Sequence, residues 1–374
     1  MATPSITIPA NLLPTDGRFG CGPSKVRAEA LNALAASGAT FLGTSHRQNG
    51  VKSVVSRLRG GLRELFSLPS DYEIVLGNGG STVFWDIATF GLIRERSQHL
   101  VFGEFSSKFA EAAAAAPHLG TPVVLEATAG TRARAIGQPG IDTYCLTQNE
   151  TSTGVAARIE RVDGADRDAL VLVDATSAAG GMEVEASSFD CYYFAPQKCF
   201  ASDGGLWTAL CSPAALDRIA SIKASKRWIP ASMDLATALD NSTKDQTYNT
   251  PALATIFLFV EQVEWMLANG GLGFAAARSK ESSDHLYAWA EASPFATPFV
   301  VDGQDRSPVV VTIDLEGVDA NTVSGVLRAN GIVDTDSYRK LGRNQLRVAT
   351  FPSIEPSDIR ALTICIDHVV SALA

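Results

Sequence analysis

The sequence predicts an α/β fold in which a large unit with a mostly parallel sheet is joined to a smaller C-terminal α/β unit. The length of 374 residues exceeds what one hydrophobic core usually holds. Helix-like and strand-like segments alternate from about residue 55 to 212, and the pattern changes after Pro251. We expect a large domain over residues 17–260 and a small domain over residues 261–374, with residues 1–16 packed on the small one.

The elements of the large unit follow from apolar runs and helical spacing. Strand-like runs lie at 72–76, 99–102, 122–125, 143–146, 170–173, 191–194 and 205–210. Helix-like segments lie at 54–66, 83–93 and 108–116. Because parallel strands need a crossover between them, strands separated by helices predict a mostly parallel, seven-stranded sheet.

The smaller unit begins with a long amphipathic segment at about 252–267. Asn269-Gly-Gly-Leu-Gly273 follows it and is typical of a helix end. The pattern then predicts a strand at 307–315, a helix at 321–329, a strand at 345–349 and a helix at 356–373. This order indicates a second α/β unit.

Composition excludes several classes of protein. The net charge of −9 and the pI near 5.1 argue against a nucleic-acid partner, because phosphate backbones need a basic surface. Six cysteines without zinc-type spacing predict reduced, buried thiols, and five histidines without metal spacing predict no metal site. The N-terminus lacks the features of a signal peptide, and no apolar run approaches a membrane span. We therefore expect a cytoplasmic protein with no membrane partner.

In open α/β sheets ligands bind at the carboxyl ends of the strands, so the residues that follow each strand are the candidates for a site. Gly79-Gly80-Ser81-Thr82 follows the first strand and begins a helix. Free backbone N–H groups, two hydroxyls and the helix dipole there favour a phosphate group. The same segment could also be an ordinary loop with a Ser or Thr N-cap. It lacks the third glycine of a dinucleotide fingerprint.

Four more strand ends carry polar or aromatic residues. Phe105 could stack on a planar ring or pack in the core, and Thr151 lies in the polar segment Asn149-Glu150-Thr151. Asp174 and Gln197-Lys198 end or follow the next two strands. Enzymes that use pyridoxal 5′-phosphate (PLP) need a lysine that forms a Schiff base and an acid that keeps the pyridine nitrogen protonated. The pair Lys198 and Asp174 therefore indicates a PLP site.

Over nearly its whole length the chain resembles the phosphoserine aminotransferases, which are PLP enzymes of fold type I and belong to the class V aminotransferases. Two departures stand out. The usual Gly-Gly-Ala-Ser loop reads Gly79-Gly80-Ser81-Thr82, and the usual His-Arg before the last arginine reads Tyr338-Arg339. The matching motifs are Phe19–Pro23, Ser45–Arg47, Gly79–Thr82, Asn149–Thr151, Val173–Ser177, Ala195–Lys198, Tyr248–Pro251 and Arg347–Thr350.

The resemblance implies a role for each candidate. Lys198 would carry PLP, Asp174 would meet the pyridine nitrogen, Phe105 would stack on the ring and Thr151 would lie beside its 3-hydroxyl. The chain would form a homodimer with shared sites. The residues implied for the cofactor phosphate are Gly80, Ser81, Thr82 and Gln197, with Asn249 and Thr250 from the other subunit. The residues implied for substrate carboxylates or phosphate are His46, Arg47, Arg339 and Arg347.

The implied reaction transfers an amino group from L-glutamate to 3-phosphohydroxypyruvate in serine biosynthesis. The analogous phosphohydroxythreonine step of pyridoxine biosynthesis is an open second use. Alternatives are an alanine- or serine:glyoxylate aminotransferase, a cysteine desulfurase and a non-catalytic PLP-binding protein. A desulfurase needs a mobile cysteine in its C-terminal part, whereas Cys365 lies in an apolar helical pattern.

Overall fold

The centre of the molecule is a seven-stranded sheet, seen in a computed structural model that describes residues 4–374. Its strands are β1 (Glu73–Gly79), β2 (Ser97–Val101), β3 (Val123–Glu126), β4 (Thr143–Thr147), β7 (Leu170–Asp174), β8 (Cys191–Phe194) and β9 (Gly205–Cys211). Their order is β1-β9-β8-β7-β4-β2-β3. Only β9 runs against its neighbours, β1 and β8, and the other pairs in this sheet are parallel. The predicted mostly parallel sheet is confirmed.

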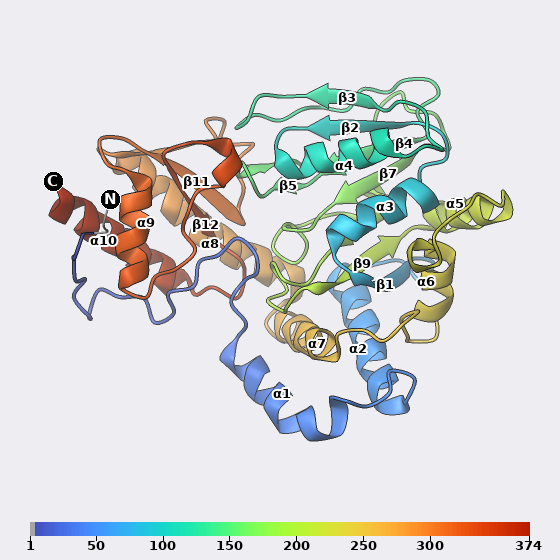
Figure 1. The fold of residues 1–374 in the computed structure, drawn as a ribbon, viewed down its shortest axis with the longest axis horizontal. Coiled ribbons are helices and arrows are strands. Elements are labelled where there is room, and N and C mark those ends of the chain that lie inside the picture. The colour runs from blue at the N-terminus through green and yellow to red at the C-terminus, as the bar shows by residue number, and fades with distance from the viewer. Residues whose placement is uncertain (1–3) are drawn as a thin grey trace.

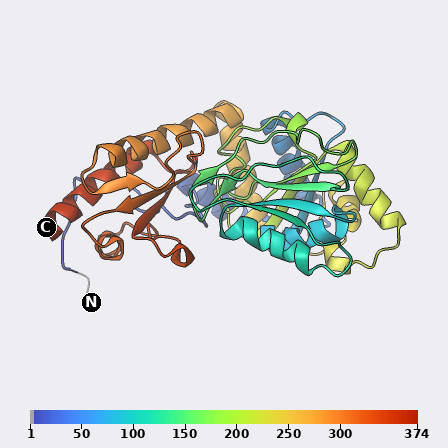
Figure 2. The same ribbon diagram turned by 90° about the horizontal axis from the view of Figure 1, so that it is seen from above.

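Helices cover both faces of this sheet, as Figures 1 and 2 show. On one face lie α1 (Ala28–Phe41), α2 (Asn49–Leu65) and α7 (Leu253–Ala268), and on the other lie α3 (Ser81–Gly91), α4 (Glu104–Ala115), α5 (Pro213–Ala224) and α6 (Leu235–Ser242). Successive strand residues face opposite cores because the side chains of a strand alternate. Tyr192 packs in the core with α2 and α7, whereas Tyr193 packs in the core with α3 and α5.

The second unit has a three-stranded antiparallel sheet of β10 (Ala296–Pro298), β11 (Val310–Leu315) and β12 (Gln345–Ala349). Its helices are α8 (Gly271–Ala292), α9 (Ala320–Ala329) and α10 (Pro356–Leu373). The N-terminal segment packs on this unit: Ile8 N–H donates to Asn330 Oδ1 at 2.9 Å, and Thr15 N–H donates to Asp358 Oδ1 at 2.8 Å. The first described residues and the C-terminal helix α10 therefore lie at the same end of the molecule, beside the small unit (Figure 1).

The sequence pattern missed α8, the longest helix. The expected helix end is real, because α7 stops at Ala268, but Gly270 and Gly271 take positive φ and α8 begins immediately. Three of its buried positions are the serines Ser279, Ser282 and Ser283, which interrupt the apolar positions of its core face and weaken the helical pattern. The elements α1, α5, α6 and β10 were also not predicted.

The expected domain boundary between residues 260 and 261 falls inside α7. This helix packs against α1 and α2 of the large unit along its length, whereas α8 packs against α10 and β10. We propose that the division lies at the turn around Asn269 and Gly270. Within residues 4–374, no helix combines the length and the apolar character needed to cross a membrane.

Candidate active site

A cavity of 270 Å³ lies at the carboxyl ends of the large sheet. It collects polar and aromatic side chains that are far apart in the sequence, because neighbouring parallel strands end at the same edge. The structure therefore brings most of the predicted cofactor residues together. The predicted residues that line this cavity are Gly80, Ser81, Thr82, Phe105, Thr151, Asp174, Gln197 and Lys198.

Lys198 follows β8 and has a strongly perturbed amine. Its Nζ donates to the carbonyl oxygen of Cys21 at 2.5 Å. Burial, with a smaller contribution from the Arg347 guanidinium, lowers the pKa of Lys198 from 10.5 to about 8. A Cβ at Gly22 would lie 2.0 Å from this Nζ, so only glycine leaves room for the amine. Near neutral pH far more of this amine is unprotonated than in an ordinary lysine, which suits a nucleophile or base.

The backbone segment from Phe19 to Cys21, which accepts a hydrogen bond from Lys198, also binds the small unit. The Phe19 N–H donates to Val333 O at 3.3 Å, and Phe19 O accepts from the Ala349 N–H of β12 at 3.0 Å. Two residues later, Cys21 O accepts from Lys198. One short stretch of backbone therefore contacts both the lysine and the strand that carries Arg347.

Asp174, at the end of β7, is buried and accepts four hydrogen bonds. Its Oδ2 accepts from the Trp85 indole N–H at 3.0 Å and from the Tyr193 hydroxyl at 3.1 Å. Its Oδ1 accepts from the Thr176 N–H at 3.0 Å and from the Thr176 hydroxyl at 2.6 Å. The sequence analysis missed Trp85 and Tyr193. The available signal was spacing, since Trp85 lies four residues after Ser81 and so on the same face of α3.

The turn from β1 into α3 forms a cradle for an anion. Gly79 and Gly80 have φ values of 127° and 148°, and a Cβ at Gly79 would lie 2.8 Å from Val83 Cγ2. The first N–H groups of α3 have no partners within the helix, and the helix dipole favours negative charge there. Ser81 Oγ and Gln197 Oε1 are buried and find no partner among the described residues. The unpaired Ser81 hydroxyl can donate to an anion, so a cradle beside the helix N-terminus fits the phosphate of PLP.

Phe105, Thr151 and Arg347 connect this cavity to the small unit. The Phe105 ring lines the cavity and lies 5.8 Å from the Tyr338 ring. Arg347, on β12, donates from Nη1 to Thr151 O at 3.1 Å, and its guanidinium lies 5.3 Å from the Tyr338 ring. Its Nε is buried and has no partner among residues 4–374. A cation with a free donor at the edge of the cavity could bind a carboxylate.

None of the four predicted substrate residues lines this cavity, although Arg347 contacts the lining residue Thr151. Asn249 and Thr250, predicted for the cofactor phosphate, also lie outside it. His46 and Arg47 contact the 246–250 segment of the same chain: Thr250 Oγ1 lies 3.3 Å from His46 Nδ1, and Arg47 Nη1 donates to Gln246 Oε1 at 3.1 Å. Burial and the charge of Arg47 lower the pKa of His46, so its ring is neutral near pH 7. Asn249 Oδ1 accepts from Asn78 Nδ2 at 2.6 Å.

Arg339 is exposed in the short 3-10 helix η3 (Arg339–Leu341). Its neighbour Tyr338, at the position where the family pattern has histidine, is the residue that contacts Phe105 and Arg347. The structure thus places the Tyr338 ring, and not the Arg339 guanidinium, against Phe105, which lines the cavity.

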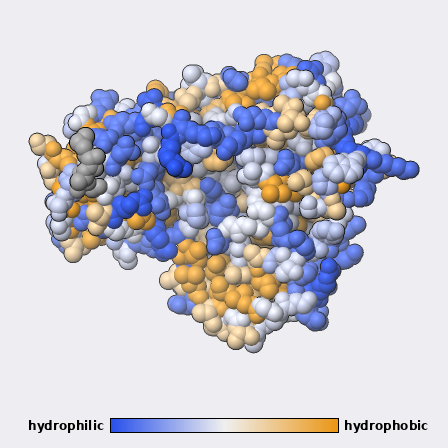
Figure 3. Space-filling view, in the orientation of Figure 1, coloured by the Kyte–Doolittle hydropathy of each residue, from blue (hydrophilic) through white to orange (hydrophobic). Residues whose placement is uncertain are grey.

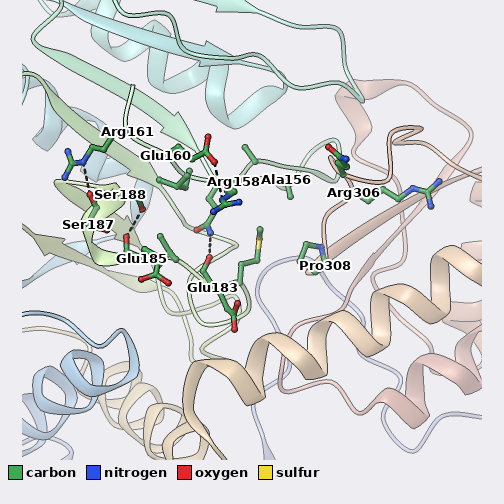
Figure 4. Close-up of a pocket in the computed structure, with 16 residues that line it drawn as sticks. Ala156, Arg158, Glu160, Arg161, Glu183, Glu185, Ser187, Ser188, Arg306 and Pro308 are labelled. Carbon is green, nitrogen blue, oxygen red and sulfur yellow. Dashed lines mark hydrogen bonds and ion pairs between the residues drawn. The ribbon is translucent and has the colours of Figure 1, made fainter. Parts of the chain in front are cut away.

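A larger cavity of 670 Å³ lies elsewhere, between the loops 156–161 and 182–188 and residues 304–308 of the small unit (Figure 4). It contains none of the predicted site residues, and its arginines are already neutralised. Their ion pairs are Arg158–Glu160, Arg161–Asp190 and Arg306–Glu291. Across the described residues, no group of three or more His, Cys, Asp or Glu side chains could hold a metal. We therefore place the functional site at the smaller cavity.

Comparison with known proteins agrees with this chemistry. The model of the aminotransferase class-V family matches residues 22–335, and the chain belongs to this family of PLP-dependent aminotransferases. Within the family it groups with the phosphoserine aminotransferases. It is 60% identical over 373 residues to the phosphoserine aminotransferase of Nocardioides sp. (strain ATCC BAA-499 / JS614), covering 99% of this chain and 100% of the relative.

Solved structures share the fold. A phosphoserine aminotransferase from Cytophaga hutchinsonii superimposes with a TM-score of 0.87 at 22% identity, covering 94% of this chain and 99% of that one. A PLP-bound phosphoserine aminotransferase from Trichomonas vaginalis gives a TM-score of 0.77 at 18% identity, covering 94% and 99%. These likenesses confirm the predicted fold type.

Proposed function

We propose that the chain transfers the amino group of L-glutamate to 3-phosphohydroxypyruvate, giving O-phospho-L-serine and 2-oxoglutarate. The observation that carries the proposal is the cavity in which the low-pKa amine of Lys198 and the carboxylate of Asp174 lie beside an anion cradle. The relatives named phosphoserine aminotransferase support the choice of substrates. The product would feed serine biosynthesis.

The residues around the cavity fit PLP. We assign Lys198 to the Schiff base, Asp174 to the pyridine nitrogen, Phe105 to the ring face and Thr151 to the 3-hydroxyl side. The unpaired Ser81 hydroxyl supports a phosphate group in the cradle formed with Gly80 and Thr82, and Gln197, which also lines the cavity, would donate through its amide nitrogen. When bound, PLP supplies a ring that withdraws electrons from the Cα of the amino acid joined to it.

The chain itself must then move one proton. Lys198, once its amine is released, would take the Cα proton of the amino donor and return a proton at the cofactor carbon to which the amino nitrogen is bound. A pKa of about 8 suits both steps, because a base works best when its pKa lies near the working pH. The Cys21 carbonyl orients this amine.

Both substrates carry several negative charges, so arginines are the expected anchors. Arg347 has a free buried Nε and would bind the α-carboxylate that all amino acid substrates share. Arg47, with His46 and Arg339, would bind the second anion. Since His46 and Arg47 lie outside the cavity of their own chain, this half of the site needs another contribution.

We infer that this contribution comes from a second copy of the chain in a homodimer. The space-filling view shows an apolar surface at the lower edge, where α1 and α7 lie (Figure 3). Leu31 of α1 and Leu42 directly after this helix are 45% and 41% exposed, and a contiguous apolar surface is typical of a contact with another protein. A two-fold contact would bring His46, Arg47, Asn249 and Thr250 of one subunit to the cavity of the other.

The six cysteines are buried and free, which supports our placement of this dimer in the cytoplasm.

Mixing two inactive variants tests the shared site. Subunits with Lys198→Ala are combined with subunits carrying Arg47→Ala, and the dimers are allowed to exchange. If Arg47 acts on the partner's cavity, each hybrid dimer contains one intact site, and random mixing restores about a quarter of the wild-type activity. No recovery in hybrids of proven composition would place Arg47 in its own subunit's site.

Glutamate-dependent turnover of a panel of keto acids tests the reaction. We expect 3-phosphohydroxypyruvate to be preferred over glyoxylate and pyruvate, and phosphohydroxythreonine's keto acid to be the next best. Equal turnover of glyoxylate would favour a glyoxylate aminotransferase, and failure to convert glutamate at all would favour a non-catalytic PLP protein. A desulfurase is disfavoured because Cys365 is buried in α10, where burial raises its pKa to about 11.

A further inference from the structure

The carboxylate of Asp174 has as many hydrogen-bond donors as it has acceptor sites. Its two oxygens offer about four lone-pair positions. Four donors already occupy them: two from Trp85 and Tyr193 on Oδ2, and two from Thr176 on Oδ1. A further N–H group that approaches this carboxylate must therefore share a site or displace one of the four donors.

The four donors differ in how easily they can leave. The rings of Trp85 and Tyr193 are fixed by packing: Trp85 is 5% exposed and stacks 6.5 Å from Phe109, and Tyr193 is fully buried and stacks 4.4 Å from Phe84. The Thr176 N–H belongs to the backbone. The Thr176 hydroxyl, in contrast, lines the cavity on a half-buried side chain and can turn away by rotation about one bond.

We propose that Trp85 and Tyr193 are positioning residues that fix the carboxylate of Asp174, and that the Thr176 hydroxyl is the donor that gives its place to the pyridine N–H of the cofactor. The proposal rests on the contact between Asp174 and the pyridine nitrogen proposed above. It adds which oxygen of Asp174 would accept the hydrogen bond from the pyridine N–H. This oxygen is Oδ1, which accepts from the Thr176 hydroxyl in this structure.

Two physical arguments support this division. A carboxylate buried without hydrogen bonds is costly, so the donors keep Asp174 charged and ordered before any cofactor arrives. Rotation of the carboxylate would break both bonds to Oδ2 at once, so its plane is held by two rigid aromatic side chains. A charge that is oriented in advance does not have to reorganise during the reaction, which is how fixed electrostatic groups lower a barrier.

The first test uses protein without cofactor and therefore does not depend on activity. The chain has five tryptophans, and Trp85→Phe identifies the indole N–H signal of Trp85 in a 1H–15N NMR spectrum. We expect Asp174→Asn to shift this signal strongly, and Thr176→Val or addition of PLP to shift it little. If the chemical shift of this signal is unchanged in Asp174→Asn, or if PLP changes it as much as Asp174→Asn does, the assigned role of Trp85 is wrong.

The second test separates positioning from damage to the core. Tyr193→Phe removes one donor to Oδ2, and Tyr192→Phe is the matched control, because Tyr192 is the neighbouring residue of β8 and donates instead to Gln148 Oε1 at 2.6 Å on the opposite face. We expect Tyr193→Phe to lower kcat about tenfold, with KM for glutamate unchanged, and to shift the pH titration of the visible cofactor band. Equal effects from Tyr192→Phe would mean that loss of packing, and not of positioning, is the cause.

The third test addresses the movable donor. Thr176→Val removes the hydroxyl and keeps the side-chain volume, so PLP should bind the variant as tightly as the wild type or more tightly, measured by equilibrium dialysis of the apo protein. Trp85→Phe should weaken PLP binding. If Thr176→Val weakens PLP binding as much as Trp85→Phe does, the Thr176 hydroxyl is not the donor that the cofactor displaces. These binding and spectral results need only PLP, so they stand even if 3-phosphohydroxypyruvate proves not to be the substrate.

Discussion

The two halves of the site are built in different ways. In the cofactor half, Lys198 and Asp174 lie at the ends of buried strands, and each has fixed partners within one chain. In the substrate half, Arg47 is exposed on a loop and Arg339 is exposed in the short 3-10 helix η3, and the side chains of Arg47 and His46 each make one hydrogen bond to the 246–250 segment. The difference teaches that Lys198 and Asp174, the two groups assigned to the chemistry, are positioned by one folded chain. The substrate anchors depend on loops, the small unit and, as we propose, a second subunit, which would also bring Asn249 and Thr250 to the cofactor phosphate.

The largest expected effect lies in the cofactor half. Lys198→Ala removes both the Schiff-base amine and the proton carrier, so we expect kcat to fall by about 10⁴-fold or more. The wild type should show a visible absorbance band that borohydride removes, and the variant should lack it. A variant that keeps the band and full turnover would refute the role of Lys198.

Asp174→Asn should be the next most severe change. The neutral amide cannot stabilise a protonated pyridine nitrogen, so we expect kcat to fall by about 10²- to 10³-fold. Folding and much of the PLP binding should persist, as judged by circular dichroism and dialysis. Near-normal transamination in Asp174→Ala would show that the electron-withdrawing power of the ring does not depend on this carboxylate.

Variants of Arg347 and Arg47 test the substrate half of the site. Removing either guanidinium should leave a substrate anion unpaired and cost about 2–5 kcal/mol in kcat/KM, with the cofactor spectrum unchanged. Arg347→Ala should lower kcat/KM for every amino acid, because the variant lacks the group that would bind the α-carboxylate. Arg47→Ala should affect glutamate and phosphoserine but not alanine. An equal loss for alanine would mean that specificity must be sought elsewhere, for example at Tyr338.

The smallest effect is a pH dependence that links the halves. The Lys198 amine must be unprotonated to capture PLP, and its pKa is lowered to about 8, so the capture rate of the apo protein should rise about tenfold between pH 7 and 9 and then level off. Since the charge of Arg347 helps to lower this pKa, Arg347→Ala should move the midpoint to higher pH. Stopped-flow mixing with PLP measures the rate. A midpoint unchanged in Arg347→Ala would show that burial alone sets it.

The sequence predicted the cofactor half better than the substrate half, for a physical reason. Residues that follow strands of a parallel sheet converge at one edge, so Asp174 and Lys198 could be paired from spacing alone. The donors behind Asp174 could not, because the contact of Trp85 depends on how α3 packs on the sheet. The positions of Arg47 and Asn249 depend on loop contacts and on assembly, neither of which has a periodic signature.

The same limit applies to the fold. The strands have apolar runs that stand out, whereas buried serines interrupt the apolar positions of α8 and weaken its helical pattern. The N-terminal segment is another example. Residues 1–16 were expected to pack on the small unit, and residues 1–3 of them lie outside the described part of the chain. The hydrogen bonds of Ile8 and Thr15 with this unit come from side chains more than 300 residues away, which no local pattern can show.

The stretch from Phe19 to Gly22 has one more consequence, which concerns distances during motion. Its backbone binds β12, which carries Arg347, through Phe19, and binds Lys198 through Cys21. If the small unit shifts relative to the large sheet, these contacts pull the lysine amine and the arginine in the same direction. The group that moves the proton and the strand that carries the carboxylate anchor are therefore tied to the same short segment of backbone, so a shift of the small unit would reach both ends of a substrate anchored at Arg347.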